Sequence, residues 1–521
     1  MSKEKRIYFY VSSDVHSHIV VPKNAPYGLS RIASFLARQR EAGKSMVVVD
    51  NGDYIQGTPL ASFMALRAKP PTPKPLIEAL NLAGYDYFNL GNHEFNFGQY
   101  YLKEAIHLFR GKVLCANCVD ENGEVALGQP YDIIEKDGIK IGLIGLITSH
   151  VPKWEQPEYI SGLTFLDPVE MAKKWAKVLR PKVDALLVTY HGGPDKDLTT
   201  GEKIGLGDRE HDALRLIDEV GELDAIFCGH QHRAICALYK GKPLLSPNWR
   251  GSHLSELALV FEDSGEGYYL KKLEPKLVSM EASEASEGIE ALMQPWQEKV
   301  EAWLEKPLGY ATKDMQINDI VKACSYNHPY LDLVNTIQLE STKADISATS
   351  FFTLGVKGLD GHIYIKDVVN NYTYSNSLKV LKVTGSDLKA ALERSASFFV
   401  VLDGQLGIRT STKGRFVSLY NYDIYKGIRY TFDVSKPVGE RVVELYFKDK
   451  PVSPEDEFTL ALNNYRAIGG GDYTMFGEEK IIRTIEQDVV DLMISYIQSN
   501  LYVDSYRENN FKVIGYENKI H

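Results

Sequence analysis

Short apolar runs alternate with amphipathic stretches along the first half of the chain. The runs are rich in Val, Ile and Leu and are too short for helices, which predicts buried strands. Between several of them, apolar residues recur at helical spacing, most clearly over residues 30–42 and 168–179. Near-continuous apolar strands that alternate with helices are typical of an α/β fold whose sheet is covered on both faces. The predicted strands are residues 7–12, 45–50, 112–116, 139–147, 185–190 and 225–228.

A change of pattern separates the two halves of the chain. Residues 262–288 are acidic, rich in Ser, Glu and Gly, and weakly patterned. Apolar residues from Ile289 to Leu304 then recur at helical spacing, which predicts an amphipathic bridging helix. Pro295 within this stretch predicts a kink or a later start. We therefore expect a first domain over residues 1–270, a linker with the bridging helix over 271–306, and a second α/β domain over 307–521.

Composition and charge narrow the class of partner. The 521 residues are too many for one ordinary domain, and 44% hydrophobic with 25% charged residues is typical of a globular protein. A net charge of −10 argues against polymeric nucleic acid, because proteins that bind it usually carry basic patches. Small phosphorylated substrates remain open, since a metal cluster can neutralise their charge locally. Nothing in the sequence indicates the oligomeric state.

The cysteines and the amino terminus bear on the compartment. Five cysteines are too few, and odd in number, for a disulfide framework, which fits a reducing compartment. No apolar run reaches the roughly 18 residues of a membrane span, so no membrane partner is expected. The first apolar run ends at Asp14 and His16, where a signal peptide would still need apolar residues. The chain as given is predicted to be cytoplasmic, and a signal removed from it would instead indicate an extracellular or periplasmic protein.

Side chains that bind metals follow the predicted strands. Asp14 and His16 stand at positions i and i+2 of a strand end, so both point to one face, and the same holds for His230 and His232. Ligand sites of α/β sheets gather at the carboxyl ends of the strands, which favours one common site. Each fragment alone is more often structural than functional, but five fragments in this order favour a metal site. The residues of these fragments that can bind a metal are Asp14, His16, Asp53, Asn92, His93, His191, His230 and His232.

The order and spacing of these fragments resemble the calcineurin-like metallophosphoesterase family, with its pattern DxH, GD, GNHE, H and GHxH. The resemblance implies an αββα sandwich for residues 1–270, with two divalent metal ions. Their mixed oxygen and nitrogen ligands suit Mn, Zn, Fe or Co. By this resemblance one metal has the ligands Asp14, His16, Asp53 and His232. The other has Asn92, His191, His230 and the shared Asp53.

His93 follows Asn92 in GlyAsnHisGlu and is not needed as a ligand. Two metals about 3.5–4 Å apart can clamp a phosphoryl group and convert bridging water to hydroxide near neutral pH. This hydroxide would attack phosphorus in line with the departing oxygen, so a phosphoric ester hydrolase is expected. His93 can face the phosphate and stabilise or protonate the leaving group, which makes it the predicted catalytic residue.

The second half resembles the carboxyl-terminal domain of the 5′-nucleotidase family. The resemblance rests on AsnAsnTyrArgAlaIleGlyGlyGlyAsp (463–472) and LeuTyrAsnTyrAspIleTyrLysGlyIleArgTyr (419–430). It implies that a nucleobase stacks between Tyr420 and Tyr465, and every base offers a face for stacking. It also implies that Asp472 bonds a ribose hydroxyl, so that a small-molecule nucleotide is the expected substrate. Two further tyrosines compete with Tyr420 for this role, Tyr422 and Tyr425.

Two departures favour one branch of that family. The 5′-nucleotidases commonly have Asp after GlyAsnHisGluPhe, where it pairs with the catalytic His, whereas this chain has the uncharged Asn96. GlyAsnHisGluPheAsn resembles instead the 2′,3′-cyclic-nucleotide 2′-phosphodiesterase/3′-nucleotidase branch. SerAlaThrSerPhePhe (347–352) likewise replaces an Arg-containing, Gly-rich segment that is expected of 5′-nucleotidases. A plain 5′-nucleotidase is the alternative.

Two other hypotheses belong to different classes. A catalytically dead nucleotide-binding protein predicts the loss of at least one ligand or of His93, and none of these residues is missing. A phosphoesterase for a non-nucleotide substrate, such as a sugar phosphate, needs no stacking residues, and the candidate tyrosines argue against it. A nucleotide phosphohydrolase is therefore the leading hypothesis.

Overall fold

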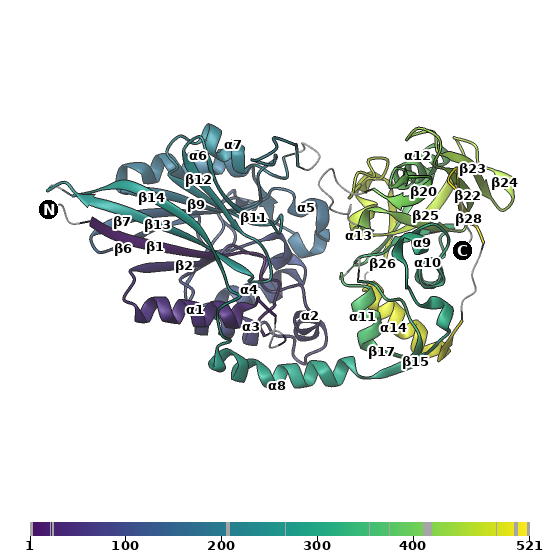
Figure 1. Cartoon of the computed structure of the whole chain (residues 1–521), viewed down its shortest axis with the longest axis horizontal. Helices are drawn as coiled ribbons and strands as arrows, with labels where there is room; N and C mark the ends of the chain where they lie inside the picture. The colour runs from purple at the N-terminus through teal and green to yellow at the C-terminus, as the bar shows by residue number, and fades with distance from the viewer. Residues whose placement is uncertain are drawn as a thin grey trace. The chain divides into compact units, whose positions relative to one another are not determined.

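The computed structural model describes residues 4–20, 22, 25–204, 209–265, 267–353, 355–374, 376–409, 419–485, 487–504 and 509–517. The chain divides into two compact units, unit 1 over Met1–Val300 and unit 2 over Glu301–His521. In Figure 1, unit 1 runs from purple to teal and unit 2 from green to yellow.

Unit 1 is built on two six-stranded sheets. The first sheet has the order β14 (Tyr268–Ser279), β13 (His253–Asp263), β1 (Glu4–Ser12), β2 (Met46–Asp50), β3 (Tyr87–Asn89) and β4 (Lys112–Leu114). In the first sheet β1 to β4 are parallel neighbours, and β13 pairs antiparallel with β1 and with β14. The second has the order β11 (Ala234–Tyr239), β12 (Lys242–Pro247), β10 (Ala225–Cys228), β9 (Ala185–His191), β7 (Ile139–Ile147) and β6 (Tyr131–Lys136). In the second sheet β12, β10, β9 and β7 are parallel neighbours, and the edge strands β11 and β6 are antiparallel. A short pair joins β5 (Cys118–Val119) to β8 (Thr164–Phe165).

The two sheets pack face to face around a shared apolar core. Phe9 and Val49 enter it from the first sheet, and Leu143 and Phe227 enter it from the second. Tyr10, the next residue of β1, faces the outer helical layer, because successive side chains of a strand alternate between its faces. The helices of unit 1 in the described residues are α1 (Leu29–Glu41), α2 (Pro59–Leu66), α3 (Lys74–Ala83), α4 (Gly98–Leu108), α5 (Val151–Trp154), α6 (Pro168–Leu179), α7 (Ala213–Glu219) and α8 (Glu287–Leu304).

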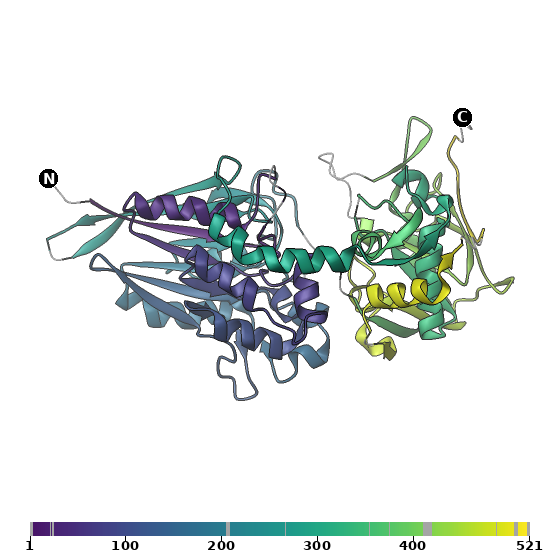
Figure 2. The same ribbon diagram turned by 90° about the horizontal axis from the view of Figure 1, so that it is seen from below.

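Helices cover the outer face of both sheets. Helices α1, α3 and α4 share a second core with the first sheet, and Figure 2 shows them side by side. Helices α6 and α7 share a third core with the second sheet. This arrangement of layers confirms the predicted αββα sandwich.

The parallel strands carry the candidate site residues to their carboxyl ends. Strands β1, β2 and β3 are parallel neighbours, and so are β9 and β10. Asp14, Asp53 and Asn92 follow the first three strands, His191 is the last residue of β9, and His230 follows β10. The apolar pattern did not predict β3, because three residues are too few to show a period.

Strand β14 lies within residues 262–288, the stretch whose sequence is weakly patterned. It pairs along its length with β13 and forms the edge of the first sheet. Leu270 and Leu273 pack against the core between the sheets, whereas Lys271 and Lys272 are exposed. An edge strand is half solvated and tolerates Lys and Pro, here Pro275, so its composition looks like that of a loop.

Helix α8 spans the stretch with helical spacing, and Pro295 lies inside it. Ile289 and Met293 lie in the core of unit 1, whereas Trp303 packs against the core of unit 2. The division between the units therefore falls within this helix, after Val300. Among the described residues, no helix combines the length and the apolar composition that a membrane crossing requires.

Unit 2 is a second α/β fold, as predicted. Its central sheet has the order β21 (Asp423–Lys426), β16 (Ile346–Ser350), β25 (Glu457–Asn463), β18 (Leu378–Thr384) and β26 (Ile481–Ile485). Three smaller sheets are β24 (Lys450–Pro451), β23 (Val442–Phe447), β22 (Arg429–Asp433) and β28 (Phe511–Ile514); β17 (Gly361–Tyr364), β15 (Pro307–Ala311) and β27 (Tyr502–Val503); and β19 (Phe399–Leu402) with β20 (Gln405–Ile408). Its helices in the described residues are α9 (Ile320–Cys324), α10 (Pro329–Thr342), α11 (Ile365–Asn371), α12 (Gly385–Ala396), α13 (Asn464–Ala467) and α14 (Val489–Asn500).

Candidate active site

The strand ends of unit 1 bring the predicted ligands into one cluster. Asp53 Oδ2 lies 3.1 Å from His191 Nε2 and 3.8 Å from His16 Nε2. Asp14 Oδ1 lies 3.5 Å from His232 Nε2 and 3.9 Å from His191 Nε2. Two groups with ligand atoms within 4.8 Å of one another contain six of the seven predicted positions. They are Asp14, His16 and His232, and Asp53, His191 and His230.

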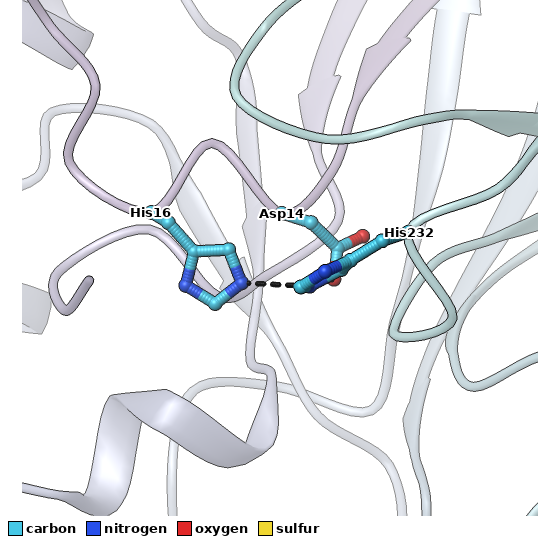
Figure 3. Close-up of side chains that lie close together, drawn as sticks. All are labelled: Asp14, His16 and His232. Carbon is cyan, nitrogen blue, oxygen red and sulfur yellow. Dashed lines mark hydrogen bonds and ion pairs between the residues drawn. The ribbon is translucent and has the colours of Figure 1, made fainter. Parts of the chain in front are cut away.

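Figure 3 shows the first of these groups, Asp14, His16 and His232. The two imidazole rings meet edge to face, with their Nε2 atoms 2.9 Å apart. His16 Nδ1 donates to the carbonyl oxygen of Gln56 at 3.1 Å, so that Nε2 of the neutral ring carries the lone pair. A carboxylate beside two imidazole nitrogens is a donor set that suits a divalent transition metal.

Two buried atoms of the cluster fit a metal centre. Within the described part of the chain, Asn92 Oδ1 is buried without a hydrogen-bond partner, and His191 Nε2 is buried 3.1 Å from Asp53 Oδ2. His191 Nδ1 donates to the carbonyl oxygen of Asn51 at 2.6 Å, so Nε2 is the nitrogen that a cation can bind once the ring is neutral. A buried polar atom left unsatisfied costs about 1–3 kcal/mol. A cation bound to Asn92 Oδ1 would remove this cost.

Five of the candidate ligands have a left-handed backbone. Residues other than glycine rarely adopt a positive φ, and each instance costs on the order of 1–3 kcal/mol. Such residues concentrate at ligand clamps, where the surrounding structure enforces the conformation. The loops after β1, β2 and β10 therefore hold strained turns that aim these side chains. The φ angles are 55° for Asp14, 49° for His16, 58° for Asp53, 69° for His230 and 52° for His232.

Electrostatics within the cluster favour a neutral His16 and an ionised Asp53. Burial lowers the pKa of His16 well below its usual value, and attraction to Asp53 opposes only part of this effect. Burial would raise the pKa of Asp53, but His191 and His93 outweigh it and hold the pKa well below its usual value. Burial would lower the pKa of His191, but Asp53 and Asp14 raise it to about 10. Since metals bind neutral imidazole, His16 is ready to bind and His191 must first lose a proton.

In unit 2, Tyr420 and Tyr465 lie in contact but do not form a sandwich. Their ring centroids are 6.2 Å apart and their planes meet at 79°. Two rings that hold a base between them must be parallel and about 7 Å apart, twice a contact distance of ~3.5 Å. One ring must therefore turn before a base can enter. Tyr422 and Tyr425, the competing candidates, are fully buried and present no face to a base.

Arg466 joins the two tyrosine segments, and sequence reasoning missed it. Its guanidinium donates to Asp423 Oδ2 at 2.6 Å and to the carbonyl oxygens of Tyr420 and Gly470. This guanidinium is buried and thus fixes both segments at once. Asp472 lies nearby in sequence, half exposed, with Oδ2 3.3 Å from Arg394 Nη2. Its role toward a ribose stays a prediction.

Known proteins agree with the fold of both units. The profile of the calcineurin-like phosphoesterases matches residues 7–234, and that of the 5′-nucleotidase carboxyl-terminal domain matches residues 308–478. The solved structure of a candidate 5′-nucleotidase from Staphylococcus aureus is 30% identical, with a TM-score of 0.89 over 98% of this chain and 100% of its own. The chain belongs to the calcineurin-like phosphoesterases that carry a 5′-nucleotidase carboxyl-terminal domain.

Two relatives are similar along most of the chain. The 2′,3′-cyclic-nucleotide 2′-phosphodiesterase/3′-nucleotidase of Haemophilus influenzae is 29% identical over 94% of this chain and 84% of its own length. The protein of the same name from Salmonella typhimurium is 29% identical over 85% and 77%. Membership of this family confirms the predicted phosphoric ester hydrolase. Because calcineurin-like phosphoesterases are dinuclear metal enzymes, two metals are expected here.

His93 of this phosphoesterase stands at the edge of the cluster. Its Nε2 lies 4.0 Å from Asp53 Oδ2, and its side chain is 29% exposed. Its Nδ1 lies 2.6 Å from Asn96 Oδ1, and Asn96 Nδ2 donates to Glu155 Oε2 at 2.6 Å. His93 therefore has one nitrogen toward the cluster and the other in a hydrogen-bond chain. Sequence reasoning placed Asn96 beside His93 but missed Glu155.

Glu94 of this phosphoesterase is a second residue whose role the sequence did not reveal. Its buried carboxylate accepts from the backbone nitrogens of Asp53 at 2.8 Å, Tyr54 at 2.7 Å and Gly91 at 2.6 Å. It thus holds the loop after β2 against the loop after β3. The motif GlyAsnHisGlu contains this residue, but only the fold shows what the carboxylate binds.

Glu210 and Trp154 of this phosphoesterase surround His230. Glu210 Oε1 lies 3.0 Å from His230 Nε2, and Glu210, His211 and His230 form a further group of close donor atoms. An Nε2–H held by Glu210 leaves only Nδ1 of His230 able to bind a cation. The Trp154 ring packs on His230 with centroids 5.2 Å apart. No spacing signal marked these residues, because they lie in connections outside the family motifs.

Proposed function

We propose that this phosphoesterase releases phosphate from nucleotides and opens 2′,3′-cyclic nucleotides before removing the remaining phosphate. The convergence of six of the seven predicted ligands in two neighbouring groups, with Asn92 Oδ1 buried and without a hydrogen-bond partner, carries the proposal. A catalytically dead binding protein has no need to keep these costly groups. The proposed metals are two ions of Mn, Zn, Fe or Co.

The residues of the cluster have distinct tasks in this proposal. Asp14, His16, Asp53 and His232 would hold one metal, and Asn92, His191, His230 and Asp53 the other. When bound, such a pair neutralises phosphoryl charge and activates water for attack on phosphorus. His93 Nε2 would stabilise or protonate the departing oxygen, because its other nitrogen is held by Asn96.

Unit 2 supplies the preference for nucleotides in this proposal. Tyr420 and Tyr465 are partly exposed and adjacent, so a base can stack on them once one ring has turned. Arg466 keeps their segments together. Asp472 would bond a ribose hydroxyl after exchanging its contact with Arg394. A sugar phosphate without a base would gain nothing from the tyrosines.

Two branches remain as candidate functions. Asn96 in place of Asp, together with the relatives from Haemophilus and Salmonella, supports the cyclic-nucleotide branch. The similarity to the candidate 5′-nucleotidase from Staphylococcus aureus supports a plain 5′-nucleotidase as the second candidate. Both candidates use the same metal cluster, so the branch is a question of substrate.

A phosphate-release panel with added Mn²⁺ tests the proposal. It compares 2′,3′-cyclic AMP, 3′-AMP, 5′-AMP, a nucleotide sugar and an RNA oligomer at equal concentration. We expect turnover of 2′,3′-cyclic AMP and 3′-AMP, with weak release from 5′-AMP and none from the oligomer. Fastest release from 5′-AMP would favour the second candidate. No release from any nucleotide would refute the proposed function.

A further inference from the structure

A hydrogen-bond chain runs from His93 away from the metal cluster. His93 Nδ1 lies 2.6 Å from Asn96 Oδ1, and Asn96 Nδ2 lies 2.6 Å from Glu155 Oε2. Glu155 directly follows α5 and is half-buried. Glu155 is thus the carboxylate that follows the uncharged Asn96 in this hydrogen-bond chain. This hydrogen-bond chain connects two segments that are 59 residues apart in sequence.

The polarity of this chain follows from what each group can donate. An ionised carboxylate only accepts hydrogen bonds, so Glu155 must face the amide nitrogen of Asn96. The amide oxygen of Asn96 then faces His93 Nδ1, and this nitrogen must carry the proton. If the amide of Asn96 were reversed, its N–H would face His93 Nδ1. It could then not accept a hydrogen bond from Nδ1 when both ring nitrogens of His93 carry a proton. Glu155 thereby selects the amide orientation that a proton-donating His93 requires.

We propose that Glu155 is a positioning residue that fixes the amide of Asn96 and so keeps the proton of His93 on Nδ1, with Nε2 toward the metal cluster. The inference rests on the proposed role of His93 at the leaving group. It assigns to two residues, an amide and a distant carboxylate, the task that an adjacent Asp performs alone. No bond is made or broken in the chain, which only orients groups.

The surroundings of Glu155 support this assignment. Its Oε1 accepts from the backbone nitrogen of Gln156 at 3.0 Å, which anchors the carboxylate from the other side. Burial raises the pKa of Glu155, while the bonds from Gln156 and Asn96 oppose this. The preceding residue, Trp154, packs on His230, so the segment is fixed to the cluster as well. Because each oxygen of the Glu155 carboxylate accepts a hydrogen bond, Glu155 is fixed in place and can hold the amide of Asn96 in one orientation.

Turnover with two leaving groups tests the proposal. In Glu155→Ala, we expect kcat for 3′-AMP to fall by about tenfold or more, because its alkoxide leaving group needs His93. The kcat for p-nitrophenyl phosphate should change little, since p-nitrophenolate leaves without a proton. Glu155→Gln, which keeps an acceptor oxygen, should retain more activity and controls for folding. Glu158→Ala, an exposed acid three residues further on, is the matched control and should have no effect. Equal losses on both substrates would overturn the proposal.

A swap of the two groups is the stricter test. In Asn96→Asp/Glu155→Gln the carboxylate moves beside His93 and the amide donates to it, so the proton stays on Nδ1. We expect the double variant to be more active on 3′-AMP than Asn96→Asp alone, in which two carboxylates face each other. A double variant no better than Asn96→Asp would overturn the proposal.

Nitrogen NMR of ¹⁵N-histidine protein separates this inference from the proposed function. The Nδ1 resonance of His93, assigned with His93→Ala, should report a protonated nitrogen in the wild type and lose this signature in Glu155→Ala. An unchanged signal in both would refute the positioning role. The spectrum needs no substrate, so it tests the positioning role of Glu155 even if the panel shows no nucleotide turnover. Absence of turnover would then refute only the proposed function.

Discussion

At the scale of single residues, hydrogen bonds decide which ring nitrogen of a histidine faces the cluster. His16 and His191 each donate Nδ1–H to a backbone carbonyl oxygen, of Gln56 and Asn51 respectively. This hydrogen bond fixes the tautomer and turns the lone pair of Nε2 inward. His93 differs, because its Nδ1 bonds a side-chain amide at the edge of the cluster. The far nitrogens of His16 and His191 thus bond backbone oxygens, whereas that of the candidate catalytic group bonds a side chain.

Replacing His93 with alanine should remove most turnover without loss of metal. We expect kcat for 3′-AMP to fall by about 10²–10⁴-fold, the usual contribution of a general acid or base. Metal analysis after dialysis should still find the wild-type content, because the ring is not needed as a ligand. If metal and activity are lost together, His93 is a ligand or a scaffold residue. His191→Ala is the matched variant that should lose metal.

Replacing Tyr465 with alanine should weaken nucleotide binding selectively. Stacking on an aromatic side chain contributes about 1–3 kcal/mol per base, so KM for 3′-AMP should rise roughly 5- to 150-fold. The KM for p-nitrophenyl phosphate should stay the same, since it has no base. Tyr502→Ala removes an exposed tyrosine of the same unit and is the control. Similar effects on both substrates would exclude base stacking on Tyr465.

At the scale of elements, two strand-end loops of the first sheet lie unusually close. Gly52 has a φ of +91°, and a Cβ there would collide with the backbone of Gly91. A Cβ at Gly91 would in turn collide with Asp53. Glu94 ties the same loops through hydrogen bonds to both. The spacing between Asp53 and Asn92 therefore depends on a contact that only glycine permits.

Substituting Gly52 with alanine should damage the metal site through these loops. The left-handed backbone alone costs roughly 1–2 kcal/mol, and displacement of Gly91 adds to it. We expect a lower melting temperature and weaker Mn²⁺ binding by calorimetry. Gly43→Ala is a matched control, because its φ is also positive, +71°, but nothing lies within 4 Å of the added Cβ. If both variants bind Mn²⁺ equally well, the close approach does not shape the site.

At the scale of the whole molecule, each unit has its own apolar cores. The three cores around the two sheets belong to unit 1, and a separate core fills unit 2. All seven candidate metal ligands lie in unit 1, whereas Tyr420, Tyr465 and Asp472 lie in unit 2. A ligand stabilises only the part of a protein that binds it. Metal binding should therefore act on the part of the unfolding profile that belongs to unit 1.

Removal of metal should lower the melting temperature of unit 1 alone. Scanning calorimetry of the chelator-treated protein should resolve two transitions, because separate cores need not unfold together. Mn²⁺ at about 100 times its dissociation constant should raise the free energy of unfolding of unit 1 by about 2.7 kcal/mol and so move its transition to a higher temperature. The other transition should stay in place. An equal shift of both, or no shift in either, would contradict the assignment of the metals to unit 1. His230→Ala should abolish the Mn²⁺ response.

The sequence by itself determined the layers of unit 1 and the set of candidate ligands. Continuous apolar strands and amphipathic helices are local patterns, so they predicted an α/β fold before any contact was known, and the resemblance of the motifs to the metallophosphoesterases implied the sandwich. The types and spacing of Asp14, His16, Asp53 and the other donors are local as well. The pattern failed where it is weak, at the three-residue β3 and at the polar edge strand β14.

Only the tertiary structure decided which distant groups complete the site. Glu155 reaches Asn96 across 59 residues, and Glu210 reaches His230 across 20, so no local pattern marks either contact. Burial likewise separated Tyr420 from the core residues Tyr422 and Tyr425, which the sequence could not rank. The physical reason is that periodicity records the face on which a residue lies. Its hydrogen-bond partner depends on how folded segments meet.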